Sequence, residues 1–200
     1  MGKKLKSIQK LDSLGLNHHV MCITRKLEEA VAFALAHPKG SVRTDFVSDS
    51  AYHLPFYVYE TWDEFQSLLP LLKKDLVNGL ELILSNGHAY DEDLRYNLVC
   101  FIDRSHQCKV EWSVKQVPLR HMYRYPNQLI SLCGNVDDRL ANWEVTNREL
   151  NAIDLREIYT RVQELFLIVD TKGLYGKHME LSVYRVPCGV YKEDMVFWEL

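Results

Sequence analysis

The sequence predicts an α+β fold, with a mixed, mostly antiparallel sheet and about three helices. Most segments with strand character follow one another without an intervening helix, which argues against a doubly wound parallel sheet. Three segments carry the apolar spacing that is typical of helices. Of the 200 residues, 47% are hydrophobic, which is enough for a single compact unit over 1–200 or for two small lobes, 1–78 and 79–200.

The first part of the chain alternates between strand and helix. An apolar run at His19–Thr24 predicts a short strand, and Thr24 can cap the helix that follows. Good helix formers fill that helix, and Pro38 and Gly40 end it. Its expected apolar stripe consists of Leu27, Val31, Ala34 and Leu35. The strands expected next are Ser41–Phe46 and Pro55–Tyr59.

A second helix begins at a capping box. In Thr61–Glu64, TWDE, the threonine hydroxyl can accept from the amide three residues on, while the glutamate returns to the threonine amide. Apolar residues then recur at helical spacing from Phe65 to Leu76. Pro70 lies inside this pattern and predicts a kink or a restart. Asn78 and Gly79 end the helix.

The remainder is predicted to be mostly strand. The strands expected first are Leu80–Leu84, Tyr96–Ile102, Lys109–Val114 and Leu129–Cys133, with Asp103–His106 as a hairpin loop. A second capping box at Thr146–Glu149 opens the longest helix, from Asn147 to Leu165. The last strands expected are Phe166–Asp170, Met179–Arg185 and Met195–Glu199.

Composition excludes several classes of protein. The net charge is −3, whereas domains that bind long phosphate backbones are usually basic, so a nucleic acid is not an expected partner. The five cysteines form no CxxC pair and are odd in number, which indicates free thiols in a reducing compartment. No segment approaches the roughly 20 apolar residues of a membrane helix. The sequence therefore predicts a cytoplasmic protein without a membrane partner.

Charged residues on strands are the remaining candidates for chemistry. The sequence has no P-loop, no GxGxxG after a strand, no GxSxG elbow and no HExxH motif. Glu111, Glu180 and Glu199 each lie in a predicted strand. Two acids that project from neighbouring strands into one cleft would form a hard-oxygen site, which Mg²⁺ favours when phosphates complete its shell. The alternative is that each acid lies on the solvent face of a half-exposed strand.

An ordered series of segments opens the chain. A Gly-Leu segment leads to a strand, then to a helix containing EEAVAFA, and then to Ser41–Asp45, SVRTD. This series resembles the start of the nucleotide-binding lobe of ATP-grasp proteins, particularly the branch of phosphoenolpyruvate synthase and pyruvate phosphate dikinase. In that branch a similar segment supplies an arginine to the ATP phosphates, and Arg43 stands at the matching position. The resemblance implies that the chain binds ATP.

The C-terminal half carries a similar likeness. The strands with Glu180 and Glu199 resemble the acid-bearing strands that hold Mg²⁺ in ATP-grasp sites. The stretch Glu111–Arg120, EWSVKQVPLR, resembles the middle strand and the basic segment after it. The resemblance implies two small ATP-grasp-like lobes, Mg²⁺ held by Glu180 and Glu199, and nucleotide contacts from Arg43, Glu111 and Arg120.

The sequence departs from the ATP-grasp pattern in three ways. It is shorter than a complete ATP-grasp enzyme, and no glycine-rich loop over the phosphates is identifiable. The usual Glu-x-Asn metal pair of the last strand is missing its asparagine, because the sequence stops at Leu200. Two interpretations stay open: a Mg-ATP-dependent ligase or phosphotransferase, and a reduced relative that only binds nucleotide.

Two functions of other classes also stay open. A non-catalytic interaction module would present His121–Pro126, HMYRYP, to a protein partner, because aromatic residues and arginine dominate binding hot spots. Single-stranded nucleic acid could stack on the tyrosines within Arg120–Arg124 while the arginines follow its phosphates. The net charge of −3 disfavours this second function.

Overall fold

The structure is a computed structural model, and it describes residues 3–46, 54–87, 94–113, 129–146, 155–186 and 192–200. The chain divides into two compact units, Met1–Ser13 with His18–His88 and Leu14–Asn17 with Ala89–Leu200. Within the described ranges every strand pairing is antiparallel. This confirms the predicted α+β class with antiparallel sheets, although the described ranges hold four α-helices rather than about three.

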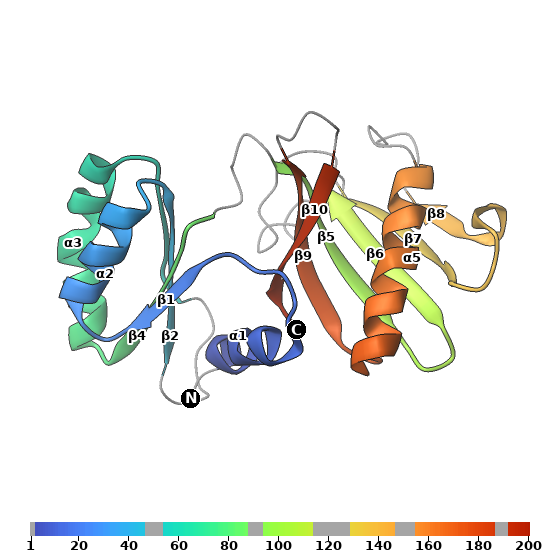
Figure 1. Cartoon of the computed structure of the whole chain (residues 1–200), viewed down its shortest axis with the longest axis horizontal. Coiled ribbons are helices and arrows are strands. Elements are labelled where there is room, and N and C mark those ends of the chain that lie inside the picture. The colour runs from blue at the N-terminus through green and yellow to red at the C-terminus, as the bar shows by residue number, and fades with distance from the viewer. Residues whose placement is uncertain (1–2, 47–53, 88–93, 114–128, 147–154, 187–191) are drawn as a thin grey trace. The chain divides into compact units, whose positions relative to one another are not determined.

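The first unit is a four-stranded sheet with helices (Figure 1). The strand order is β1-β4-β2-β3, so β2 and β4 are central. The unit keeps β4, which the predicted boundary after residue 78 assigned to the other lobe. Its elements are α1 (Lys3–Leu14), β1 (Met21–Thr24), α2 (Leu27–Ala36), β2 (Gly40–Phe46), β3 (Phe56–Tyr59), α3 (Trp62–Val77) and β4 (Leu80–Ser85).

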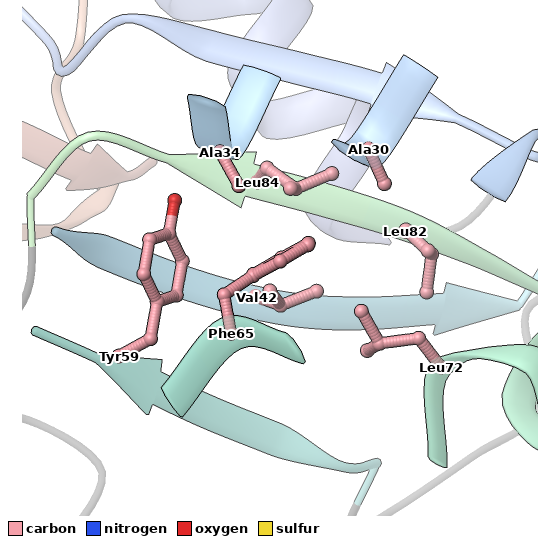
Figure 2. Packing of buried hydrophobic residues seen from close by; sticks show 8 residues of the cluster. All are labelled: Ala30, Ala34, Val42, Tyr59, Phe65, Leu72, Leu82 and Leu84. Atoms are coloured by element: carbon pink, nitrogen blue, oxygen red, sulfur yellow. The ribbon is translucent and has the colours of Figure 1, made fainter. Parts of the chain in front are cut away.

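Helices α2 and α3 cover one face of this sheet, and the core lies between them and the strands (Figure 2). Val42 of β2 points into this core and is fully buried. The ring of Tyr59 packs edge-on against Phe65, with 5.0 Å between centroids. The buried cluster consists of Ala30, Ala34, Val42, Tyr59, Phe65, Leu72, Leu82 and Leu84. Since side chains alternate along a strand, the neighbours of Val42 face the other way.

Helix α1 was not predicted from the sequence. Its sequence is rich in lysine, and its apolar stripe, in which Ile8 and Leu11 are buried, is short. The helix lies against β2, since the Leu5 amide donates to Asp45 Oδ2 at 3.2 Å. This hydrogen bond is buried and joins residues far apart in the sequence, so helical periodicity alone does not reveal it.

Three details of the first unit differ from the prediction. Thr24 is not the N-cap of α2: Lys26 is, and the Thr24 hydroxyl accepts from the Lys26 amide at 2.9 Å. Leu35 is 62% exposed, whereas Ala30, which the predicted stripe left out, is fully buried. Helix α3 continues through Pro70 as one element from Trp62 to Val77, so it does not restart there, and the alternative of a kink stays a prediction.

The start of α3 confirms the threonine half of the predicted capping box. Thr61 is the N-cap, and its hydroxyl accepts from the Glu64 amide at 3.2 Å. The Glu64 carboxylate accepts from the amide of Glu60 rather than from that of Thr61. The glutamate therefore satisfies a backbone donor one residue before the expected one.

The second unit is a six-stranded sheet with α5 along one face (Figure 1). The strand order is β10-β9-β5-β6-β7-β8. The face that α5 covers is called the helix face below. The elements are β5 (Leu94–Ile102), β6 (Gln107–Ser113), β7 (Leu129–Asn135), the 3₁₀ turn η2 (Leu140–Asn142), β8 (Glu144–Thr146), α5 (Leu155–Lys172), β9 (His178–Val186) and β10 (Lys192–Glu199).

The predicted strand at Phe166–Asp170 is wrong, because these residues belong to α5. The buried stripe of α5 continues through them with Leu165 and Val169, four residues apart on one helix face. A short apolar run cannot be assigned to strand or helix by periodicity alone. The predicted helix start at Asn147–Glu149 lies outside the described residues.

Among the described helices, none is long and apolar enough to cross a membrane.

Candidate functional site

Two of the predicted acids meet on neighbouring strands of the second unit. Glu199 of β10 is the ladder partner of Glu180 of β9. Residues directly opposite in an antiparallel pair project to the same face, with Cβ atoms about 4.5–5.5 Å apart. Both side chains are partly buried. The register therefore brings together the two carboxylates that the sequence placed on separate strands.

The third predicted acid lies in the same row of the sheet. Glu180 pairs with Val99 of β5, and Val99 pairs with Glu111 of β6. Glu111 is thus two strands away from Glu180 on the same face, which is called the carboxylate face below. Its carboxylate lies 2.6 Å from Lys109 Nζ. Glu111 therefore shares the face of the pair, but β5 separates it from Glu180.

A β-bulge in β10 creates the meeting of Glu180 and Glu199. Phe197 pairs with Leu181, but the next ladder pair is Glu199 with Glu180, so Trp198 is an extra residue. In a regular ladder Trp198 would oppose Glu180, and Glu199 would turn to the helix face. Bulges are frequent beside functional sites, where they redirect a side chain. Here the bulge moves Glu199 onto the carboxylate face.

Three buried polar side chains, the indole network, lie beside the pair. Trp198 Nε1 donates to Ser182 Oγ at 2.6 Å, and Ser182 Oγ donates to Asn97 Oδ1 at 2.5 Å. Asn97 and Ser182 have no exposed surface, and Trp198 is 7% exposed. The network spans β5, β9 and β10 on the carboxylate face. Sequence analysis did not select these residues; a polar residue two positions after Glu180 was the available signal.

The carboxylate pair has the chemistry of a site for a hard cation. Like charges directly opposite each other repel, and any positive charge held beside them reduces that repulsion. Carboxylate oxygens are the ligands that Mg²⁺ prefers, together with water and phosphate oxygens. Among the described residues no group of three or more His, Cys, Asp and Glu side chains could hold a metal. The pair supplies two carboxylates to such a site and no third acidic, histidine or cysteine ligand among the described residues.

Arg43 lies in the first unit, in the middle of the central strand β2. Its backbone pairs with Phe56 of β3 and Ile83 of β4. Because Val42 points into the core, Arg43 projects from the opposite face, and its side chain is partly buried. Arg120 and the stretch His121–Pro126 lie outside the described residues.

A cavity of about 400 Å³ lies on the other side of the second sheet. It is lined by the inward-facing Phe197 of β10 and by Arg161, Glu164 and Ile168 of α5, with the short segment Gly15–Asn17 closing one side. The Phe197 amide donates to the Asn17 carbonyl at 2.8 Å. This cavity is therefore separate from the carboxylate pair.

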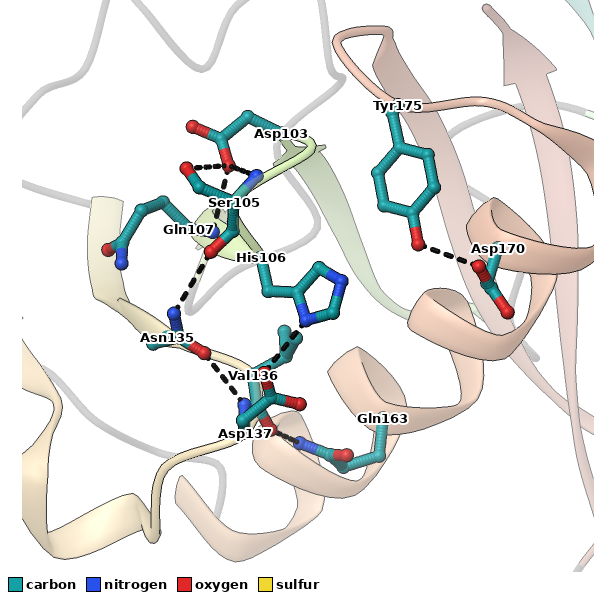
Figure 3. A network of polar contacts seen from close by, with 10 residues as sticks. All are labelled: Asp103, Ser105, His106, Gln107, Asn135, Val136, Asp137, Gln163, Asp170 and Tyr175. Carbon is teal, nitrogen blue, oxygen red and sulfur yellow. Dashed lines mark hydrogen bonds and ion pairs between the residues drawn. The ribbon is translucent and has the colours of Figure 1, made fainter.

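A second set of polar contacts, the loop network, joins the loop residues Asp103–Gln107 to Asn135–Asp137 (Figure 3). His106 follows β5 with φ of 63°, and its Nδ1 lies 2.7 Å from Asp137 Oδ2. Its ring packs edge-on against Phe166 of α5, with centroids 4.8 Å apart. It also stacks on Tyr175 at 6.1 Å with an angle of 10° between the rings. A positive φ is uncommon outside glycine, although histidine adopts it more often than most residues do.

Asp103 organises the turn that presents His106 (Figure 3). Its Oδ1 accepts from the Ser105 amide and hydroxyl, both at 2.8 Å, and from the Gln107 amide at 3.0 Å. The Ser105 hydroxyl, ahead of the other donors, lowers the pKa of Asp103. The turn falls where the hairpin loop was predicted, but nothing in the sequence paired His106 with Asp137.

Comparison with known proteins shows the fold. No protein-family model and no curated protein match the sequence. Solved structures do match. The match to an N5-carboxyaminoimidazole ribonucleotide synthetase (TM-score 0.56, 10% identity) covers 98% of this chain and 43% of the synthetase chain. The match to a D-alanyl-alanine synthetase A from Vibrio cholerae (TM-score 0.51, 8% identity) covers 98% of this chain and 53% of the synthetase chain. The match to the Staphylococcus aureus N5-carboxyaminoimidazole synthetase (TM-score 0.50, 7% identity) covers 97% of this chain and 44% of the synthetase chain.

These matches have the ATP-grasp fold, and at such identities they show the fold alone. The chain spans about half the length of each solved structure. They confirm the predicted ATP-grasp-like fold. They do not single out the phosphoenolpyruvate-synthase branch, which stays a prediction from Ser41–Asp45.

Proposed function

We propose that this chain binds ATP as a protein of ATP-grasp type, and that the carboxylates of Glu180 and Glu199 would hold Mg²⁺. The observation that carries the proposal is the register of β10, which sets Glu199 directly opposite Glu180. Two strand carboxylates supply a rigid pair of oxygen ligands. Bound Mg²⁺ would supply charge neutralisation on the phosphates.

Three further residues belong to the proposal. Arg43 contacts the phosphates, since its planar guanidinium can hold two phosphate oxygens at once. Arg120 adds a second cation at the phosphates, and Glu111 contacts the nucleotide. The cytoplasm stays the predicted location, and a protein partner stays an open prediction.

The likeness in fold to the matched structures, rather than the site, supports the proposed reaction class. Two of the solved synthetases were determined with ADP. We infer that this chain belongs to a Mg-ATP-dependent ligase or phosphotransferase, and the acceptor would be recognised by residues that this fold comparison does not define. The net charge of −3 favours this function over nucleic-acid binding, because domains that bind a long phosphate backbone are usually basic.

Calorimetric titration of the chain with ATP, with and without Mg²⁺, tests the proposal. We expect Mg²⁺ to strengthen ATP binding at least tenfold, and Glu180→Gln or Glu199→Gln to remove that gain. Arg43→Ala should weaken ATP binding whether or not Mg²⁺ is present. The comparison variant is Glu111→Gln, at the proposed nucleotide contact two strands away on the same face. It should weaken ATP binding equally with and without Mg²⁺ and so keep the Mg²⁺ effect. ATP binding that ignores Mg²⁺ in the unmodified chain would overturn the metal assignment.

A further inference from the structure

We infer that the indole network, Asn97, Ser182 and Trp198, positions the Glu199 carboxylate and thereby sets the affinity of the pair for a divalent cation. The inference rests on the proposed metal role of Glu180 and Glu199. None of the three network residues is a proposed metal ligand; they act through Glu199.

The hydrogen bonds of the network have one consistent direction. The indole N–H of Trp198 can only donate, so Ser182 Oγ must accept from it at 2.6 Å. The serine hydroxyl then has its single proton left for Asn97 Oδ1, at 2.5 Å. All three side chains are at least 93% buried. Because a buried polar group without a partner is costly, this arrangement fixes the indole in one orientation.

The orientation of the indole decides where Glu199 can lie. Trp198 and Glu199 both stand opposite Glu180, because the bulge places two residues of β10 against one of β9. Ser182 lies two residues along β9 from Glu180, on the same face. A bond to Ser182 therefore draws the indole away from Glu180. The position beside Glu180 is then left to the Glu199 side chain.

Loss of the network would favour the competing register. With Trp198 released, β10 can pair regularly, so that Trp198 opposes Glu180 and Glu199 turns to the helix face. The cation site would then keep one carboxylate instead of two. Substitution of residues that orient metal ligands commonly lowers metal affinity about 10-fold to 100-fold.

Titration of the full chain with Mn²⁺ alone, followed by the electron paramagnetic resonance of free Mn²⁺, tests the inference. We expect Ser182→Ala and Trp198→Phe each to weaken Mn²⁺ binding at least tenfold, although both leave Glu180 and Glu199 in place. Ser182→Thr keeps the hydroxyl and should restore most of the affinity. The matched control is Ser41→Ala, which removes another fully buried serine hydroxyl, bonded at 3.0 Å to the Gly87 carbonyl in the first unit. That control should lose stability and keep its Mn²⁺ affinity.

The outcomes separate this inference from the proposed function. The double variant Glu180→Gln/Glu199→Gln defines the background, and an unmodified chain that binds Mn²⁺ no better than this background contradicts both proposals. Tight binding in the unmodified chain and in Ser182→Ala overturns the inference alone. If Ser182→Ala does not fold, Trp198→Phe decides, because it keeps an aromatic ring in the same place. An equal loss of affinity in Ser41→Ala would also overturn the inference, since the effect would then follow stability.

Discussion

The two polar networks of the second unit have opposite surroundings. In the indole network, Asn97 and Ser182 are fully buried. In the loop network, the side chains of His106 and Asp137 are 35% and 66% exposed. Water can replace a lost contact at the exposed site but not at the buried one. The difference teaches that a hydrogen bond lost from the indole network is not replaced by water, so this network can hold the bulge in β10 in a single arrangement.

The largest effect on stability is expected from Ser182→Ala. The substitution leaves Trp198 Nε1 and Asn97 Oδ1 buried without this partner, which costs about 1–3 kcal/mol in the free energy of unfolding. The matched variant Ser105→Ala removes a hydroxyl from the exposed loop network and should stay within about 0.5 kcal/mol of the unmodified chain. Urea unfolding followed by circular dichroism measures both. Equal losses in the two variants would contradict the contrast between the networks.

The second effect concerns the left-handed backbone at His106. His106→Ala removes the ring contacts and keeps the unfavourable φ, whereas His106→Gly also removes the contacts but relieves the backbone. We expect the glycine variant to be more stable than the alanine variant by about 1 kcal/mol. Thermal and urea unfolding of the pair provide the measurement. An alanine variant that matches the glycine variant would show that φ at this position carries no strain.

Tyr57 in the first unit offers an intermediate case between the two networks. Its hydroxyl donates to Asp75 Oδ2 at 2.8 Å, and burial, followed by Asp75, raises the pKa of Tyr57 to about 12. The neutral phenol stabilises the fold fully below pH 10, the ordinary tyrosine value, and this contribution is lost as the pH rises through about 12. Ultraviolet titration should show late-ionising tyrosines, because burial also raises the pKa of Tyr59 and of Tyr96, and Tyr57→Phe should reduce their number by one. Ionisation of every tyrosine near pH 10 would contradict the burial.

The smallest effect is expected from the exposed carboxylate of Asp103. Its hydrogen bonds lower its pKa below the ordinary value. The ionised form therefore stabilises the fold above about pH 4, and the contribution disappears as the pH falls through the lowered pKa. Comparison of melting temperatures between pH 5 and pH 2 should show a smaller acid-induced fall in Asp103→Asn than in the unmodified chain. Parallel curves would mean that the turn gains nothing from the charge.

Sequence reasoning predicted the strands of the candidate site but not its geometry. The apolar runs around Glu180 and Glu199 were long enough to assign as strands, and both acids were selected from them. Their register depends on the extra residue Trp198, and a bulge has no apolar or turn signature in this stretch. The indole network was missed for the same reason, since cross-strand partners are set by register.

Local ambiguity explains the remaining errors. The run Phe166–Asp170 is apolar enough for a strand, and only the continuation of the buried stripe to Val169 identifies it as helix. Helix α1 was missed because lysines dilute its apolar stripe. Arg43 was placed correctly on a strand, but its proposed contact with phosphate comes from the likeness of Ser41–Asp45 to a family and stays a prediction.

The central claim is that Glu180 and Glu199 hold one ion together, and a double-mutant cycle tests it most directly. The Mg²⁺-dependent gain in ATP affinity would be measured by calorimetry for the unmodified chain, Glu180→Gln, Glu199→Gln and the double variant. Two ligands of one ion act as a unit, so each single variant should lose most of the gain and the double variant little more. Independent, multiplying losses, or a gain that survives in either single variant, would contradict a shared ion.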